Sequence, residues 1–172
     1  MLRNIIFRGK RINRNGEWGY GDLRRYGGNT WVFPHNQDAA YDADMVDPET
    51  VGELTGLKDK NGKDIYEGDI LKVEEYINMM SSSIFDSKEI SEAYEAFTLD
   101  ELKGKLVRSY VTPIVFEEGS FCISSHAADN ENYPDMFLAC LYGDMKRSFP
   151  IFDFEVIGNI HDNPELLYEC QR

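Results

Sequence analysis

The sequence has few of the features that mark a secreted, membrane-bound or zinc-binding protein. Its three cysteines are widely separated and include no Cys-x-x-Cys pair, so we expect free thiols, with Cys122 and Cys140 as small core residues. No apolar run approaches the roughly 18 to 20 residues that span a membrane. The start offers only Ile5–Phe7 before Arg8, far short of the about 7–15 apolar residues of a signal peptide. We therefore expect a soluble, cytoplasmic protein without membrane contact.

The sequence also lacks the short motifs that are typical of enzymes. It contains no GxSxG, HExxH, GxxxxGK[ST] or GxGxxG pattern, which removes the usual arguments for a hydrolase, a zinc protease or a nucleotide site. An aspartate-rich loop at residues 35–48 lacks the spacing of an EF-hand, and His126 lies among acids without the pattern of a metal site. We interpret His161, beside Asp162, as a turn residue. We predict no catalytic residue, no cofactor and no metal.

The chain is acidic, and its charges are unevenly distributed. It has 31 acidic and 18 basic residues and a net charge of -13, which repels nucleic acid and anionic membranes. Residues 1–30 nevertheless hold seven basic and two acidic residues, so this segment carries +5 and the remainder -18. A basic segment on an acidic chain either docks on the acidic surface of a second copy or contacts phosphates. We favour the first, and expect a homo-oligomer.

Arginines and aromatic residues in this basic segment, and directly after it, are the candidate interaction residues. They are Arg8, Arg11, Trp18, Tyr20, Arg24, Arg25 and Trp31. Some of them, together with Phe33, would make a stacking platform for single-stranded nucleic acid. A hydrophobic face between sheets explains the same aromatics, and the net charge favours that interpretation.

Period-two alternation and turn residues predict a mainly β (α+β) chain. Turns are expected at residues 13–16, 27–28, 60–63 and 117–120, with Asn61 and Gly62 suited to a type I′ hairpin. Pro113 predicts an edge or a bulge in the strand that surrounds it. The expected strands are residues 5–7, 18–20, 29–33, 71–74, 105–116, 121–123 and 152–156.

Residues 77–104 have a different character. Ile90, Ala93 or Tyr94, and Phe97 recur at helical spacing among glutamates. Thr98 with Glu101 has the capping-box pattern. We expect a short acidic helical insertion at about 84–104, and a short helical cap near residues 165–167. We divide the chain into an N-terminal β-hairpin and sheet region, 1–45, and a C-terminal β-rich, barrel-like region, 46–172.

Several blocks of the sequence together resemble the YopX family of phage and prophage proteins. The resemblance implies several large open, mostly antiparallel sheets, an SH3-like barrel in the C-terminal half, and an origin in a bacteriophage or integrated prophage. It brings no established activity and no catalytic residue, and residues 77–104 and 124–150 match nothing in it. The blocks are IFRGKR (6–11), GEWGYGDL (16–23), VDPETVG (46–52), TGLKDKNG (55–62), YEGDI (66–70) and FEVIGNIHDNPELL (154–167).

The sequence therefore predicts a phage-encoded, non-enzymatic interaction or assembly protein whose partner is a phage or host protein. Open sheets leave strand edges that must be covered or paired, which adds to the expectation of self-association. The alternatives are a nucleic-acid module that uses the basic N-terminal hairpin, an acidic decoy that imitates DNA, and an enzyme with an unrecognised site.

Overall fold

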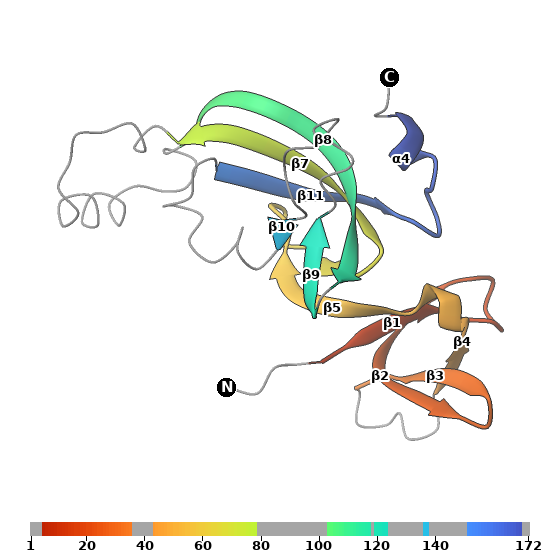
Figure 1. Cartoon of the computed structure of the whole chain (residues 1–172). Helices are drawn as coiled ribbons and strands as arrows, with labels where there is room; N and C mark the ends of the chain where they lie inside the picture. The colour runs from red at the N-terminus through yellow and green to blue at the C-terminus, as the bar shows by residue number, and fades with distance from the viewer. Residues whose placement is uncertain are drawn as a thin grey trace, which may run out of the picture.

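The computed structural model describes residues 5–35, 43–78, 103–117, 119–123, 136–137 and 151–169. These residues form two antiparallel sheets. Within the described ranges only two short helices occur, η2 (Pro48–Thr50) and α4 (Leu166–Glu169). Figure 1 shows the first sheet, built mainly from the N-terminal third, beside the second, built from the rest. The predicted mainly β class is confirmed.

The first sheet has six strands in the order β4-β3-β2-β1-β5-β6. Gly27 and Gly28 both have positive φ, as a type I′ turn requires, and they join β2 to β3 where a turn was predicted. β4 lies inside the segment predicted as a loop, and that prediction was wrong because the buried Val46 pairs with Thr30. The strands are β1 (Phe7–Lys10), β2 (Trp18–Tyr26), β3 (Asn29–Phe33), β4 (Asp44–Val46), β5 (Gly52–Lys58) and β6 (Asp64–Tyr66).

The first sheet curls until its β4 edge returns to the end of β1, where Arg11 bridges Val46. Gly9 and Gly19 face each other across β1 and β2. A Cβ atom on Gly9 would lie 2.8 Å from Val46, and one on Gly19 would lie 2.8 Å from Val32. Both valines are fully buried, so the absence of a side chain at the two glycines leaves the space that the valine side chains fill inside the curled sheet.

The second sheet has the order β10-β9-β8-β7-β11. Pro113 does not lie on an edge strand, because β8 runs between β7 and β9. It lies where β8 changes partner: Ile70 of β7 pairs with Pro113, and the next residue, Ile114, pairs with Ile123 of β9. The strands are β7 (Asp69–Asn78), β8 (Lys103–Glu117), β9 (Ser120–Ile123), β10 (Met136–Phe137) and β11 (Ile151–Asn159).

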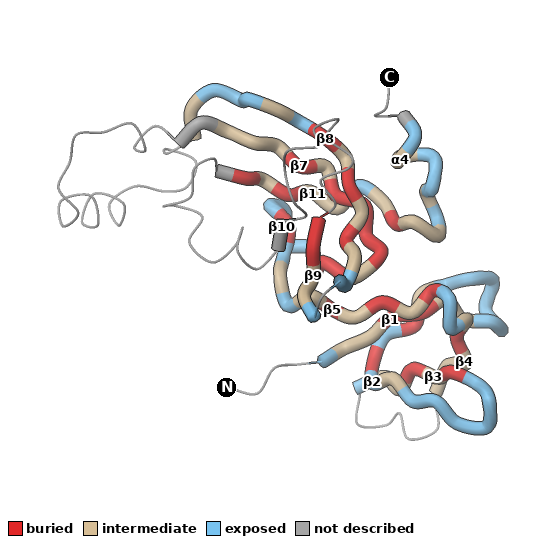
Figure 2. The backbone as a smooth tube through the Cα atoms, in the orientation of Figure 1, coloured by how far each residue is buried: buried red, intermediate tan, exposed pale blue. Residues whose placement is uncertain are grey.

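The main core lies on one face of the second sheet, shown in red in Figure 2. The predicted alternation is confirmed, since Leu71 and Val73 are fully buried there while Lys72 and Glu74 lie on the opposite face. Ile65 from β6 also belongs to this core, so the β5–β6 hairpin covers the second sheet. The buried core residues are Ile65, Leu71, Val73, Tyr110, Ile114, Ile123, Phe152 and Phe154.

The expected SH3-like barrel is not found, because both sheets are open in the part of the chain that is described. The helical insertion at 84–104 falls outside the described residues except for Lys103 and Gly104, which begin β8 and are not helical. The division at residue 45 stays a prediction. That boundary falls inside β4, and β5 and β6 belong to the same sheet as β1 to β3.

Candidate functional site

The seven predicted interaction residues fall into separate environments. Trp18 and Tyr20 contact residues of the central and C-terminal segments, whereas Trp31 and Phe33 line a pocket of their own. The four aromatics therefore do not form a single stacking platform. Arg8, Trp18 and Tyr20 lie at the junction of the two sheets. Arg11 directly follows β1. Arg24, Arg25 and Trp31 lie on the β2–β3 hairpin.

Arg8 is the centre of the sheet junction and is only 7% exposed. Its guanidinium lies 2.7 Å from Asp69 Oδ1 and donates a hydrogen bond to the Glu67 carbonyl at 3.1 Å. The same guanidinium lies 4.6 Å from the Trp18 ring and 4.8 Å from the Tyr66 ring. A buried cation held between two rings and paired with a buried carboxylate joins the sheets, and is not available to a partner.

The C-terminal turn docks on the same junction. Trp18 Nε1 donates to Asp162 Oδ2 at 2.9 Å, and Lys10 forms an ion pair with the same carboxylate. Burial opposes ionisation of Asp162, but the hydrogen bonds from Lys10 and Trp18 outweigh it and hold its pKa below the ordinary 3.8. The pKa of His161 is lowered by burial and then by the nearby Lys10 and Arg8 charges. A neutral His161 against the Trp18 ring, 6.2 Å between centroids, agrees with a turn residue.

Four basic residues of the segment 1–30 are therefore paired within the molecule. Arg8 and Lys10 meet carboxylates from the central and C-terminal segments, which the sequence assigned to the acidic remainder. Docking of the basic segment on an acidic surface takes place inside one chain. The pairs are Arg8 with Asp69 (2.7 Å), Lys10 with Asp162, Arg11 with Asp44 (2.7 Å) and Glu17 (3.4 Å), and Arg14 with Asp44 (3.9 Å).

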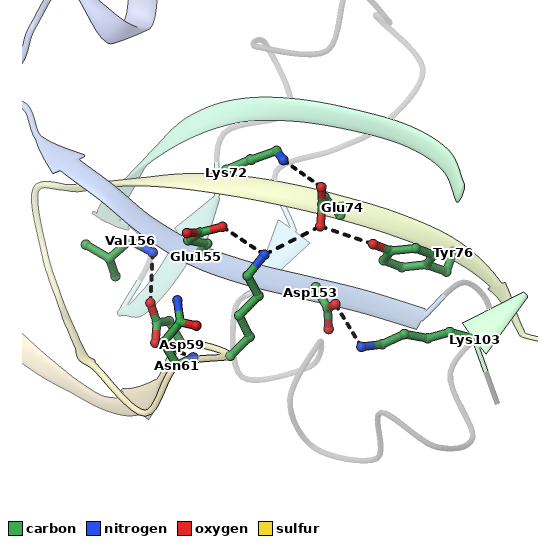
Figure 3. Close-up of polar contacts among 10 residues, drawn as sticks. Asp59, Asn61, Lys72, Glu74, Tyr76, Lys103, Asp153, Glu155 and Val156 are labelled. Carbon is green, nitrogen blue, oxygen red and sulfur yellow. Dashed lines mark hydrogen bonds and ion pairs between the residues drawn. The ribbon is translucent and has the colours of Figure 1, made fainter. Parts of the chain in front are cut away.

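A second polar cluster covers the outer face of β7 and β11 (Figure 3). Its hydrogen bonds with Glu155 and Glu74 raise the pKa values of Lys60 and Lys72, and the bond from Lys72 lowers the pKa of Glu74. A catalytic lysine or acid needs the opposite shifts, so we interpret this cluster as structural. Its ion pairs are Lys60 with Glu155 (2.8 Å) and Glu74 (3.7 Å), Lys72 with Glu74 (2.6 Å) and Lys103 with Asp153 (2.8 Å).

Asp59 fixes the β5–β6 turn against the edge of β11. Its Oδ1 accepts the N–H groups of Asn61 and Lys63 at 2.8 and 2.9 Å, and its Oδ2 accepts the Val156 N–H at 3.1 Å. Burial opposes ionisation, but these bonds outweigh it and lower the pKa of Asp59. The predicted type I′ turn is wrong. Such a turn needs positive φ at both central residues, and only Gly62, not Asn61, has it. The carboxylate of Asp59 organises this turn and covers part of an open strand edge.

The β2–β3 hairpin carries an exposed pocket with aromatic walls. The pocket has a volume of about 340 Å³ and is lined by Arg24, Tyr26, Trp31, Phe33 and Ala43. Arg24 lies opposite Trp31 in the ladder, and its guanidinium is 4.7 Å from the Phe33 ring. Tyr26 is 79% exposed. This aromatic pocket is the candidate binding site.

The aromatic pocket differs from the junction in its charges. Within the described ranges, neither Arg24 nor the adjacent Arg25 forms an ion pair with a carboxylate. The nearest acid on β2, Asp22, instead lies 2.7 Å from His35 Nε2. The sequence predicted both arginines and Trp31 but missed Tyr26. The Gly27-Gly28 turn could have revealed it, because that turn sets the register and places residues 24 and 26 on one face.

The described part of the chain shows no group of three or more His, Cys, Asp or Glu side chains placed to hold a metal ion. It also has no helix of the length and apolar character that a membrane span requires. Cys122 is buried, 3% exposed, as predicted for a core residue. Cys140, Cys170, His126 and the aspartates at 38 and 42 lie outside the described residues.

Of three comparisons with known proteins, one shows the family of the chain. A family model described as YopX protein matches residues 14–168. Among solved structures, protein EF1440 from Enterococcus faecalis is similar with a TM-score of 0.45 and 19% identity, over 95% of this chain and 98% of that one. No curated protein matches. The family match runs from the turn before β2 into α4, and the chain therefore belongs to the YopX family.

Proposed function

We propose that this protein is a non-enzymatic protein–protein interaction module, of phage or prophage origin, that works in the bacterial cytoplasm and binds its partner through the aromatic pocket. The observation that carries the proposal is the contrast in charge. Arg8, Lys10 and Arg11 are held by carboxylates of the same chain. Arg24, against the Phe33 ring, and the exposed Arg25 that follows it have no carboxylate partner in the described residues. Arginine, tyrosine and tryptophan are the side chains that most often dominate binding energy at interfaces.

The charge of the chain favours a protein partner over a nucleic acid. Nucleic-acid binding without sequence preference needs several cations along a groove, each facing a phosphate. The described residues offer two such cations near the aromatic pocket, on a chain of net charge -13. Self-association stays a separate prediction, and light scattering at micromolar concentration tests it.

Site-specific photo-crosslinking in the bacterial host tests the proposal. A benzophenone amino acid replaces Tyr26 in one protein and Tyr168 in a matched control, since both tyrosines are strongly exposed, at 79% and 72%. We expect one defined protein adduct at position 26, identified by mass spectrometry, that is absent at position 168 and is lost in Arg24→Ala. A nuclease-sensitive adduct, the same adducts at both positions, or no adduct at position 26 contradicts the proposal.

A further inference from the structure

We infer, resting on the proposed function, that the aromatic pocket takes one large apolar or aromatic side chain from an extended acidic peptide, whose carboxylates pair with Arg24 and Arg25. The size of the pocket supports a single inserted side chain. A volume of about 340 Å³ lies at the low end of the ~300–1,000 Å³ typical of small-ligand sites. Trp31 and Phe33 provide ring faces for it, with the small Ala43 beside them.

The position of Arg24 supports a carboxylate next to the inserted side chain. Its guanidinium lies 4.7 Å from the centroid of the Phe33 ring, and contact with a ring does not use the N–H donors that a carboxylate needs. A planar guanidinium pairs with a carboxylate through two parallel hydrogen bonds. Arg25 is exposed and follows Arg24 in β2, so it lies on the opposite face of the strand. It can pair with an acidic side chain that the extended peptide turns to that face.

The open edge of β2 supports an extended peptide. Residues Phe7–Lys10 of β1 pair with β2 only as far as Gly21, and residues 22–26 pair with β3 on their other side. Before Phe7, the Ile6 carbonyl accepts the Leu54 N–H at 2.8 Å, which continues the ladder between β1 and β5. The described residues Ile5 and Ile6 do not pair with β2. In the described residues this leaves one edge of residues 22–26 without a strand. A peptide that adds there places every second side chain on the face that carries Arg24 and Tyr26.

The two tryptophans of the chain provide the readout. Trp31 lines the aromatic pocket, whereas the Trp18 indole N–H is bonded to Asp162 at the junction. The full-length protein labelled with nitrogen-15 is titrated with the capped peptide Glu-Asp-Phe-Asp-Glu, and both indole N–H signals are followed by NMR. We expect the Trp31 signal to shift with saturation while the Trp18 signal stays in place.

Control peptides and variants separate the parts of the inference. The peptide with Ala in place of Phe, and the peptide with Lys in place of every acid, should each bind at least about tenfold more weakly. Arg24→Ala should weaken binding of the acidic peptide about tenfold. Trp31→Ala removes the reporting indole, so its affinity is measured by calorimetry, and it should fall about thirtyfold. An unchanged Trp18 signal shows that each variant is folded. Lys10→Ala removes a cation of the junction and should leave the affinity unchanged.

The outcomes distinguish this inference from the proposed function. The inference is supported if the Trp31 signal alone shifts with saturation and the control peptides and variants lose affinity as stated above. No shift with the acidic peptide, equal binding of the Ala peptide, or tighter binding of a short oligothymidylate overturns it. If the acidic peptide fails while the benzophenone at position 26 still captures a protein, the inference falls and the proposed function stands. If the peptide binds but no protein is captured, the proposed function falls.

Discussion

Two regions of this molecule place an arginine against aromatic rings, and they differ in what surrounds the cation. At the junction, Arg8 is buried between Trp18 and Tyr66 and paired with Asp69. On the β2–β3 hairpin, Arg24 lies on one ring, exposed, with no carboxylate partner among the described residues. The same residue types therefore join the two sheets in one place and form a candidate binding surface in the other. Burial and charge pairing distinguish the two roles.

The largest expected effect is a difference in stability between the alanine variants of the two arginines. Arg8→Ala leaves the Asp69 carboxylate, 3% exposed, buried without its cation, and such a change costs about 3–5 kcal/mol. Arg24→Ala should change the free energy of unfolding by less than about 0.5 kcal/mol, because it removes an exposed side chain. Urea unfolding followed by circular dichroism measures both. Equal losses in the two variants would contradict the distinction between junction and pocket.

A second prediction concerns the curl that supports the hairpin. Gly9→Ala places a Cβ atom 2.8 Å from Val46, and overpacking of this kind costs about 1–3 kcal/mol. The control adds Val46→Ala, which makes room for the new methyl group. We expect Val46→Ala to cost clearly less in the Gly9→Ala background than in the native chain, by urea unfolding. Additive losses would show that the two residues do not press on each other.

The turn that covers the β11 edge should respond to acid. The folded pKa of Asp59 is depressed below its ordinary 3.8, so its contribution is fully present above that pH and is lost as the pH falls through the folded value. Asp59→Asn places an amide N–H near the Val156 N–H and should cost about 1–3 kcal/mol at neutral pH.

Unfolding free energies measured from pH 6 down to pH 2 should therefore fall less steeply in Asp59→Asn than in the native chain. Asp162→Asn is the matched control, because the pKa of that carboxyl is lowered in the same direction at the junction. Each variant should remove part of the acid sensitivity. If Asp59→Asn follows the native curve at all pH values, the turn is not held by the ionised carboxylate.

The smallest expected effect is a difference in stability between the phenylalanine variants of the two tryptophans. Trp18→Phe removes the hydrogen bond to Asp162 and should cost about 1 kcal/mol. Trp31→Phe keeps a ring in the aromatic pocket and should change the free energy of unfolding by less than about 0.5 kcal/mol. Thermal or urea unfolding of the two variants measures the difference. A larger loss at Trp31 would mean that the pocket, too, holds the fold together.

Local features of the fold could be predicted from the sequence. Turn residues such as Gly27 and Gly28 mark the hairpin because glycine adopts positive φ without strain. The alternation of Leu71 and Val73 with Lys72 identifies the buried face of β7, since successive side chains of a strand point to opposite faces.

The contacts between distant segments could not be predicted in this way. Trp18 and Asp162 are 144 residues apart in the chain, and no periodicity or spacing indicates that they meet. The same holds for the bridge of Arg11 to Val46, which brings the β4 edge back to the end of β1. The sequence could name the arginines of the candidate site but could not separate Arg8 from Arg24, because their carboxylate partners depend on those contacts.

The most direct test measures stability and peptide affinity on one matched pair, Arg8→Lys and Arg24→Lys. Lysine keeps the charge but loses the planar group that stacks on a ring and pairs with a carboxylate through two bonds. We predict that Arg8→Lys lowers the free energy of unfolding by about 1–3 kcal/mol and leaves the affinity for the acidic peptide unchanged, whereas Arg24→Lys lowers the affinity several-fold and leaves stability unchanged. If Arg8→Lys weakens binding in a stable protein, or Arg24→Lys destabilises the fold, the division between junction and binding surface is wrong.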